Sequence, residues 1–186
     1  MKLIAGVDEV GRGSLIGPVY AAAVILSKDI NKNLLKDSKS LSKDKREFLA
    51  KYIKENSVWA VGKASVKEIE RMNILHASLL AMKRAIKKLK KKPILVLIDG
   101  NKLPEIKNYK LKSIVKGDQK IPSIWAASIL AKVTRDKMIS SLAKNFKDYY
   151  WDKNFGYGTK QHLEAIKKLG ITTHHRKTFS PIIKKT

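Results

Sequence analysis

The pattern of apolar and polar residues along the chain predicts a protein that mixes helices with strands. Runs rich in Val, Ile and small apolar residues predict strands over 2–9, 17–26, 57–66, 94–98 and 113–115. Apolar residues spaced by three and four predict helices over 43–55, 74–89, 122–145 and 161–169. The strand at 94–98 is apolar throughout, which is typical of a strand covered on both faces among parallel neighbours. This order predicts an α/β fold around a mixed sheet.

Length and composition limit the class of protein. No repeat, low-complexity segment or linker divides the 186 residues, so we expect a single domain over 1–186 with a basic tail over 171–186. The absence of cysteine excludes disulfides and thiolate metal sites. The longest apolar run, Tyr20–Leu26, is far shorter than the roughly 20 residues that span a bilayer, and no signal peptide is recognisable. We therefore expect a cytoplasmic, monomeric protein without a membrane partner.

The charge balance points to a polyanionic partner. The chain has 40 Lys and Arg against 16 Asp and Glu, a formal net charge of +24. Nucleic acid is the simplest partner for such a protein, although a Lys-rich background composition would give the same charge without one. The lysine-rich run over 87–92 has the same two interpretations. It would bind DNA, or it is a solvated helix end, and we favour the second interpretation.

Three of the few acids lie at the ends of predicted strands. Asp8 and Glu9 end the first strand, and Asp99 follows the apolar strand over 94–98. Ligands of open α/β sheets bind at the carboxyl ends of the strands, although Asp99 before Gly100 is equally consistent with a simple turn. Adjacent strand residues point to opposite faces, so Asp8 and Glu9 serve one site only if the strand ends or twists there.

A fourth acid lies on a predicted helix. Asp136 continues the apolar series Ala126, Ile129 and Val133 with the spacing of one helical face. A carboxylate on an inward face is costly unless a cation or strong hydrogen bonds neutralise it. A salt bridge with Arg135 or Lys137 is the alternative to a functional role, but these neighbours point elsewhere on the helix.

Four such carboxylates would suit divalent cations. Mg²⁺ and Mn²⁺ prefer oxygen ligands, and two ions about 3.5–4 Å apart assist phosphodiester hydrolysis. Acids clustered in a strongly basic protein therefore indicate a metal-dependent nuclease. A basic nucleic-acid-binding protein without catalytic activity is the competing hypothesis, but such a protein gains nothing from carboxylates that face phosphates.

Several motifs, in this order along the chain, resemble ribonuclease HII, the type 2 ribonucleases H. They begin with Asp8-Glu9-Val10-Gly11-Arg12-Gly13 and include Asp37-Ser38-Lys39, Asp99-Gly100-Asn101, Lys116-Gly117-Asp118, Arg135-Asp136, Gly156-Tyr157-Gly158 and His175-Arg176. The chain departs from the usual family pattern at Ser14 and Ile16, where Pro and Ala are more frequent, and at Phe155, where a basic residue is common. Neither Ser14 nor Ile16 is expected to carry the chemistry.

The resemblance implies a fold, an activity and a set of site residues. It implies a ribonuclease H-like fold with a mixed five-stranded sheet flanked by helices and a short C-terminal helical or tail segment. It implies an endoribonuclease that cuts the RNA of RNA–DNA hybrids and incises 5′ of ribonucleotides in duplex DNA, as in ribonucleotide excision repair, leaving 5′-phosphate and 3′-hydroxyl ends. The implied catalytic and metal-binding residues are Asp8, Glu9, Asp99 and Asp136, with Mg²⁺ or Mn²⁺; the implied substrate contacts are Gly11, Arg12, Gly13, Tyr157, Ser38 and Lys39.

Overall fold

A five-stranded mixed sheet forms the centre of the protein. The computed structural model describes residues 3–35 and 42–182. The sheet has the order β3-β2-β1-β4-β5, in which β1 pairs antiparallel with β2 and parallel with β4. The pair β2–β3 is antiparallel and the pair β4–β5 is parallel. The strands are β1 (Ile4–Val10), β2 (Val19–Leu26), β3 (Ser57–Ala64), β4 (Leu95–Asp99) and β5 (Leu111–Ile114).

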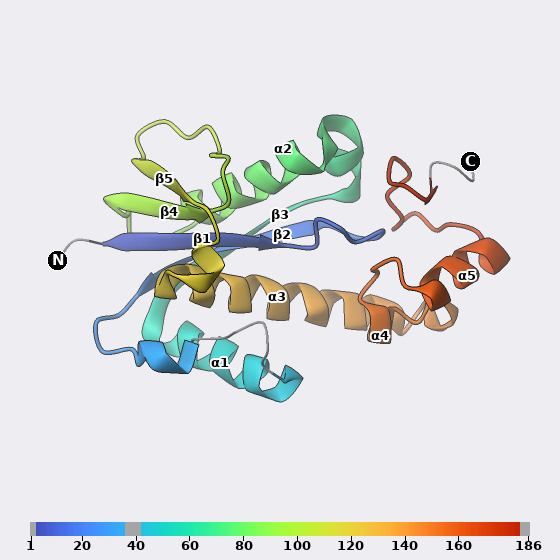
Figure 1. The fold of residues 1–186 in the computed structure, drawn as a ribbon, viewed down its shortest axis with the longest axis horizontal. Coiled ribbons are helices and arrows are strands. Elements are labelled where there is room, and N and C mark those ends of the chain that lie inside the picture. Colours follow the sequence, from blue (N-terminus) through green and yellow to red (C-terminus); the bar gives the residue numbers. More distant parts are fainter. Residues whose placement is uncertain (1–2, 36–41, 183–186) are drawn as a thin grey trace.

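Helices cover both faces of this sheet. Figure 1 shows α2 (Val66–Lys87) on one side and α3 (Pro122–Ala143) on the other, with α1 (Lys43–Asn56) beyond α3. The remaining elements are η1 (Lys32–Leu35), η2 (Gly117–Gln119), η3 (Lys147–Tyr149), α4 (Trp151–Asn154) and α5 (Lys160–Leu169). The predicted α/β fold with a mixed five-stranded sheet flanked by helices is therefore confirmed.

Small residues let the two large helices lie directly against the sheet. A Cβ added at Gly6 in β1 would lie 2.2 Å from the backbone carbon of Ser123 in α3. A Cβ added at Gly62 in β3 would lie 2.2 Å from the carbonyl oxygen of Ala81 in α2. These contacts fix the distance of α3 from β1 and the distance of α2 from β3.

Helix α2 begins earlier than the sequence pattern predicts. We expected a strand to continue to Val66 and a helix to start at Ile74, but α2 starts at Val66. A capping box explains the start, because the Ser65 hydroxyl accepts from the Glu68 amide while the Glu68 carboxylate accepts from the Ser65 amide. Asn73, at φ 68°, kinks the helix and interrupts its apolar period.

The segment that follows α5 is packed against the rest of the protein. We expected a basic tail from 171 onward, yet His175, Arg176 and Ile182 are buried. Ile182 joins a cluster that also contains Ile16 and Trp151, and Ile16 forms an isolated antiparallel bridge with His175. The chain therefore returns from its C-terminal part to the connection between β1 and β2.

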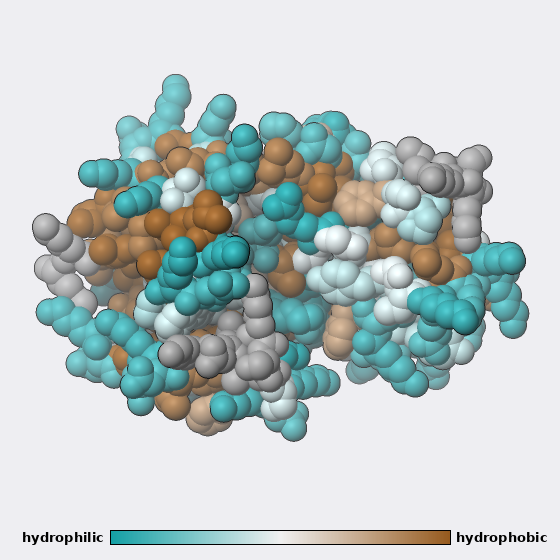
Figure 2. Space-filling model, in the orientation of Figure 1, coloured by the Kyte–Doolittle hydropathy of each residue, from teal (hydrophilic) through white to brown (hydrophobic). Residues whose placement is uncertain are grey.

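The visible surface is mostly hydrophilic. Figure 2 shows polar side chains over most of this face and hydrophobic residues gathered on the side of β4 and β5. Within the part of the chain described, no helix combines the length and the hydropathy needed to cross a membrane.

Candidate active site

The register of two parallel strands brings three acids to one end of the sheet. Val7 of β1 pairs with Ile98 of β4, so Asp8 and Asp99 follow at the carboxyl ends of adjacent strands. Glu9 comes next in β1. These three side chains lie at the edge of the sheet where the sequence predicts that ligands bind.

Asp8 and Glu9 point to opposite sides of β1. Asp8 is 6% exposed and forms a side-chain hydrogen bond with Ser128 of α3. The backbone N–H of Glu9 also donates to Asp8 Oδ1, at 2.7 Å. The Glu9 side chain lies in a cleft beside α2 and accepts from Arg12 Nη1 at 3.3 Å.

Asp99 is fixed by the loop that follows β5. Its Oδ1 accepts from the backbone N–H of Gly117 at 2.7 Å and from that of Asp118 at 3.3 Å. The backbone of η2 therefore orients the Asp99 carboxylate. A Cβ at Gly117 would lie 3.3 Å from Asp99 Oδ1, so a larger residue would crowd this contact.

The three acids influence each other electrostatically. Burial raises the pKa of Asp8 well above its usual value, and the charges of Glu9 and Asp99 raise it further. Burial also raises the pKa of Glu9, while the neighbouring Arg12 opposes this effect. The cluster therefore concentrates negative charge that a cation would stabilise.

The chemistry of this donor set fits a divalent metal. Carboxylate oxygens are the ligands that Mg²⁺ and Mn²⁺ prefer, and a bound cation would relieve the repulsion among Asp8, Glu9 and Asp99. As the side chains lie, no group of three or more acids or histidines within 3–35 and 42–182 forms a ready-made metal site.

A cleft of about 330 Å³ opens beside the acids. It lies between the ends of β1 and β4 and one face of α2, and it leads to Glu9 and Asp99. The lining residues are Glu9, Arg12, Leu75, Ser78, Leu79, Met82, Asp99, Gly100, Asn101 and Lys102. The two acids and the two basic residues, Arg12 and Lys102, that line this cleft suit a phosphate that approaches a metal ion.

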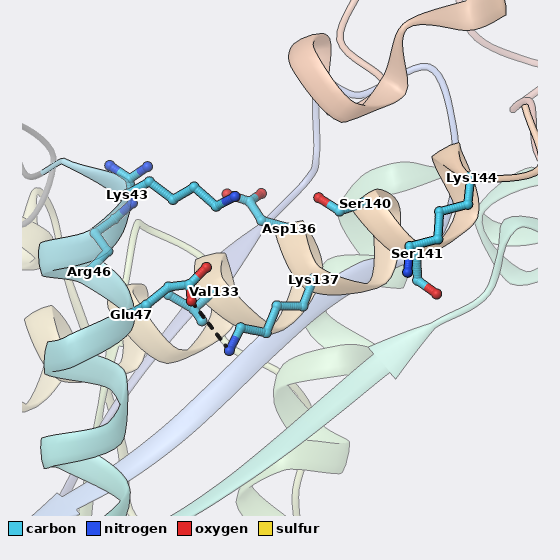
Figure 3. A pocket seen from close by; sticks show the side chains of 9 residues that line it. All are labelled: Lys43, Arg46, Glu47, Val133, Asp136, Lys137, Ser140, Ser141 and Lys144. Atoms are coloured by element: carbon cyan, nitrogen blue, oxygen red, sulfur yellow. Dashed lines mark ion pairs between the residues drawn. The ribbon is translucent and has the colours of Figure 1, made fainter. Parts of the chain in front are cut away.

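Asp136 lies in a different pocket. The hydrogen bond of Asp8 reaches α3 at Ser128, and Asp136 comes eight residues later, about 12 Å further along an ideal helix. Its carboxylate accepts from Lys132 Nζ at 2.8 Å, and not from Arg135 or Lys137. Figure 3 shows Asp136 in a pocket of about 220 Å³ between α1 and α3, where Lys137 pairs with Glu47 at 3.6 Å. The residues that line this pocket include Asp136 but not Asp8, Glu9 or Asp99.

The residues expected to contact substrate lie together where they are described. A Cβ at Gly13 would be 4.0 Å from Tyr157 Cε1, although the two residues are distant in sequence. Gly11 has φ +91°, and a Cβ there would lie 2.3 Å from Arg135 Nε, so only glycine fits. Arg12 is half exposed and projects beside Glu9. Ser38 and Lys39 lie outside the described residues.

Sequence reasoning missed several residues near the site. The Lys116-Gly117-Asp118 motif contains Asp118, but the motif alone does not indicate the hydrogen bond of its backbone to Asp99. Ser128 and the two buried arginines, Arg135 and Arg176, were given no role. Their partners lie far away in sequence, so no local pattern indicates them.

Comparison with known proteins identifies a family and a fold. Residues 5–182 match the family described as ribonuclease HII. The chain is 75% identical to ribonuclease HII of Pelagibacter ubique (strain HTCC1062), over 98% of each chain. The crystal structure of ribonuclease H2 from Pyrococcus horikoshii OT3 matches with a TM-score of 0.80 and 28% identity, over 97% of this chain and 95% of that chain. The crystal structure of Bst-RNase HIII in complex with Mn²⁺ has a TM-score of 0.81 at 20% identity, over 98% of this chain and 68% of that chain, and so shares the fold.

These matches confirm the family resemblance of the motifs, the expected fold and the expected enzymatic activity. A fold alone would not identify an activity, but here the family match extends over the acids and the loop beside them. The chain therefore belongs to the ribonuclease HII family, whose members are metal-dependent endoribonucleases that act on RNA–DNA hybrids.

Proposed function

We propose that this protein, besides acting on hybrids, incises duplex DNA on the 5′ side of embedded ribonucleotides. The products would carry 5′-phosphate and 3′-hydroxyl ends, as ribonucleotide excision repair requires. One observation carries this proposal. The acids at the ends of β1 and β4 lie beside the Gly11–Gly13 loop, because Arg12 of this loop contacts Glu9. A group that reads a ribose is therefore close to groups that support phosphodiester hydrolysis.

The loop supplies a way to distinguish RNA from DNA. The 2′-hydroxyl is the chemical difference between the two, and glycines allow backbone donors and acceptors to approach it closely. Gly13 lies against the ring of Tyr157, so a sugar bound at the loop would also contact this ring. We assign Gly11, Arg12, Gly13 and Tyr157 to recognition of the ribose and its phosphate. We retain Ser38 and Lys39 as proposed phosphate contacts.

The acids hold the catalytic cations. We propose that Asp8, Glu9 and Asp99, together with Asp136, would hold two divalent ions, Mg²⁺ or Mn²⁺, which when bound would activate water and stabilise the leaving oxygen. Asp99 is held in one orientation by the amides of Gly117 and Asp118. Ser128 and the Glu9 amide orient Asp8 in the same way. Arg12 contributes positive charge at the rim, where the substrate phosphate enters.

The fourth acid is a choice between Asp136 and Asp118. The helical spacing and the resemblance predict Asp136, which faces the pocket between α1 and α3 and pairs with Lys132. Asp118 is the alternative, because its backbone N–H donates to Asp99 Oδ1 at 3.3 Å. We therefore propose Asp136 as the fourth acid, and a direct comparison with Asp118 tests this assignment.

One assay tests the activity. Wild type and Asp99→Asn are incubated with three duplexes: an RNA–DNA hybrid, DNA with one ribonucleotide, and DNA alone, with Mg²⁺ or Mn²⁺ and with chelator. We expect wild type to cut the first two in metal, and Asp99→Asn to lose at least about 100-fold in rate while it still binds. Wild type that binds the single-ribonucleotide duplex but never nicks it would refute the proposal and favour a binding role for that substrate.

A second comparison decides the fourth acid. Asp118→Asn and Asp136→Asn are assayed on the same hybrid over a range of Mn²⁺ concentrations. If Asp136 belongs to the metal cluster, its variant needs more metal and turns over at least about 10-fold more slowly, while Asp118→Asn keeps the metal dependence of wild type. The reverse result would assign the role to Asp118.

The proposal includes the setting in which the enzyme works. We expect a monomer that acts in the cytoplasm on duplexes containing RNA. Sedimentation of the purified protein without and with a short hybrid tests the monomeric state, because a monomer binds one short duplex as a one-to-one complex.

A further inference from the structure

Two fully buried arginines lie under the loop that connects β1 to β2. Arg135 comes from α3 and Arg176 from the segment after α5, and both are 0% exposed. Neither forms an ion pair with a carboxylate within the described chain. Burial lowers the pKa of Arg176 to about 9, and the like charge of Arg135 contributes. Buried charges without acids are costly, so this arrangement calls for an explanation beyond packing.

Both guanidinium groups bind backbone carbonyls of the loop. Arg176 Nε donates to the Gly17 carbonyl at 2.9 Å, and its Nη1 donates to the Arg12 carbonyl at 3.0 Å. Arg135 Nη2 donates to the Ile16 carbonyl at 3.3 Å. A planar fork that bridges separate carbonyls fixes their relative positions more tightly than apolar contacts would.

Ser14 joins the loop to the turn that carries Tyr157. Its Oγ accepts from Arg135 Nη2 at 2.7 Å and lies 3.0 Å from the Gly156 carbonyl, to which its hydroxyl can donate. Arg135 Nη1 donates to the Phe155 carbonyl at 3.1 Å, and the guanidinium carbon lies 5.6 Å from the centre of the Tyr157 ring. One buried network therefore holds both sides of the proposed ribose-reading site.

We propose that Ser14, Arg135 and Arg176 are positioning residues that fix the Gly11–Gly13 loop relative to Tyr157 and so set the preference for a ribonucleotide at the cut. This inference rests on the proposed function of that loop. None of the three side chains is exposed, so they act through the loop and the turn and not by touching the substrate. Misplacement of a reacting group by about 1 Å can reduce a rate about 100-fold, so loss of one link has a measurable effect.

Ser14→Ala is the most selective perturbation. It removes the hydroxyl that links Arg135 to the Gly156 carbonyl and changes the volume very little. We expect kcat on DNA with one ribonucleotide to fall about 10-fold, with a smaller loss on the long hybrid. The Kd for an all-DNA duplex should stay within about 2-fold of wild type, because the basic surface is unchanged.

Ser57→Ala is a matched control. Ser57 Oγ, in β3, is buried without a hydrogen-bond partner, so this variant also removes a buried hydroxyl but cuts no link to the loop. It should retain the wild-type kcat and the wild-type ratio between the two substrates. Near-ultraviolet circular dichroism and urea unfolding of each variant report whether the fold is intact.

A second pair of variants tests the role of the Arg135 guanidinium group. Arg135→Met removes every donor of the guanidinium group. Arg135→Lys keeps the charge and can still donate to some of the same acceptors, so the lysine variant should recover part of the substrate ratio. If Arg135→Met does not fold, the Ser14→Ala result alone decides the question. A Ser14→Ala enzyme that keeps the wild-type kcat and substrate ratio, or loses activity equally on both substrates, would overturn the positioning role.

Failure of this inference is distinguishable from failure of the proposed function. If wild type does not nick the single-ribonucleotide duplex, the proposed function itself fails. If wild type nicks it and Tyr157→Ala loses the preference while Ser14→Ala keeps it, the ribose-reading site stands and only the positioning role is refuted.

Discussion

Acid should destabilise this protein through one buried histidine. His175 is 0% exposed, and its Nδ1 accepts from the Thr172 amide at 2.9 Å. Its ring packs 5.4 Å from that of Tyr149 and 5.6 Å from that of Trp151. Because the amide only donates, Nδ1 carries no proton in the neutral ring. Protonation would remove this hydrogen bond and place a charge in an aromatic cluster.

The size of the effect follows from the pKa. Burial lowers the pKa of His175 from 6.5 to about 4, and the neighbouring His162 and His174 contribute when charged. The unfolded chain therefore binds more protons than the folded one between these values. This contribution to stability is fully present above pH 6.5 and is lost as the pH falls through about 4. The difference between the pKa of His175 in the unfolded and folded states corresponds to about 3 kcal/mol of stability. About 2.5 kcal/mol of this stability is lost between about pH 7.5 and pH 4.5.

His175→Asn tests this reasoning, because the amide oxygen can replace Nδ1 as an acceptor and does not titrate. Urea unfolding followed by tryptophan fluorescence gives the free energy of unfolding at about pH 7.5 and pH 4.5. Wild type should lose about 2.5 kcal/mol more than the variant over this range. His76→Asn, at an exposed histidine, should lose as much as wild type. Equal losses in wild type and His175→Asn would refute the assignment.

Three further predictions concern binding and stability. Replacing both Lys43 and Lys144 by Gln should weaken duplex binding and reduce the magnitude of the slope of log K against log salt by about 1.8, if each neutralises one phosphate; a salt titration measures this. Gly6→Ala should lower the free energy of unfolding by about 1–3 kcal/mol in urea, because its Cβ would overlap the backbone of α3. Glu68→Gln should cost about 1 kcal/mol in the same assay, because it weakens the capping box and the pair with Arg84 at 2.7 Å.

The lysine prediction has an internal control. Lys90 and Lys91 follow α2 in a run that we interpret as a solvated helix end. Replacing both by Gln changes the net charge as much as the Lys43 and Lys144 replacements do. An equal change in salt slope for both pairs would mean that overall charge, and not the pocket between α1 and α3, governs binding.

The fold could be predicted from local patterns wherever burial follows a regular period. The apolar strand that becomes β4 and the helix opened by Pro122 are examples. The start of α2 was predicted too late because Asn73, at φ 68°, interrupts the period. Ser65 and Glu68 have the spacing of a capping box and could have indicated the true start.

The site could be predicted only in part, for a physical reason. Asp8, Glu9 and Asp99 each lie near the carboxyl end of a strand, and a local rule is enough to select them. Asp118 depends on the Asp99 carboxylate, 19 residues away, for its place beside the cluster. Arg176 looks like one more surface cation, and only its hydrogen bonds to carbonyls of the β1–β2 connection show that it is buried.

The bridge between Ile16 and His175 also has a consequence for synthesis of the protein. The loop at 11–17 leaves the ribosome early, but its partners at 155–157 and 174–176 are made about 140–160 residues later. At about 5–20 residues per second this is a delay of roughly 7–30 s. Throughout that interval the nascent chain carries the acids of β1 without the scaffold of the loop. A ribosome-bound chain should therefore be unable to select ribonucleotides until nearly all of it has been translated.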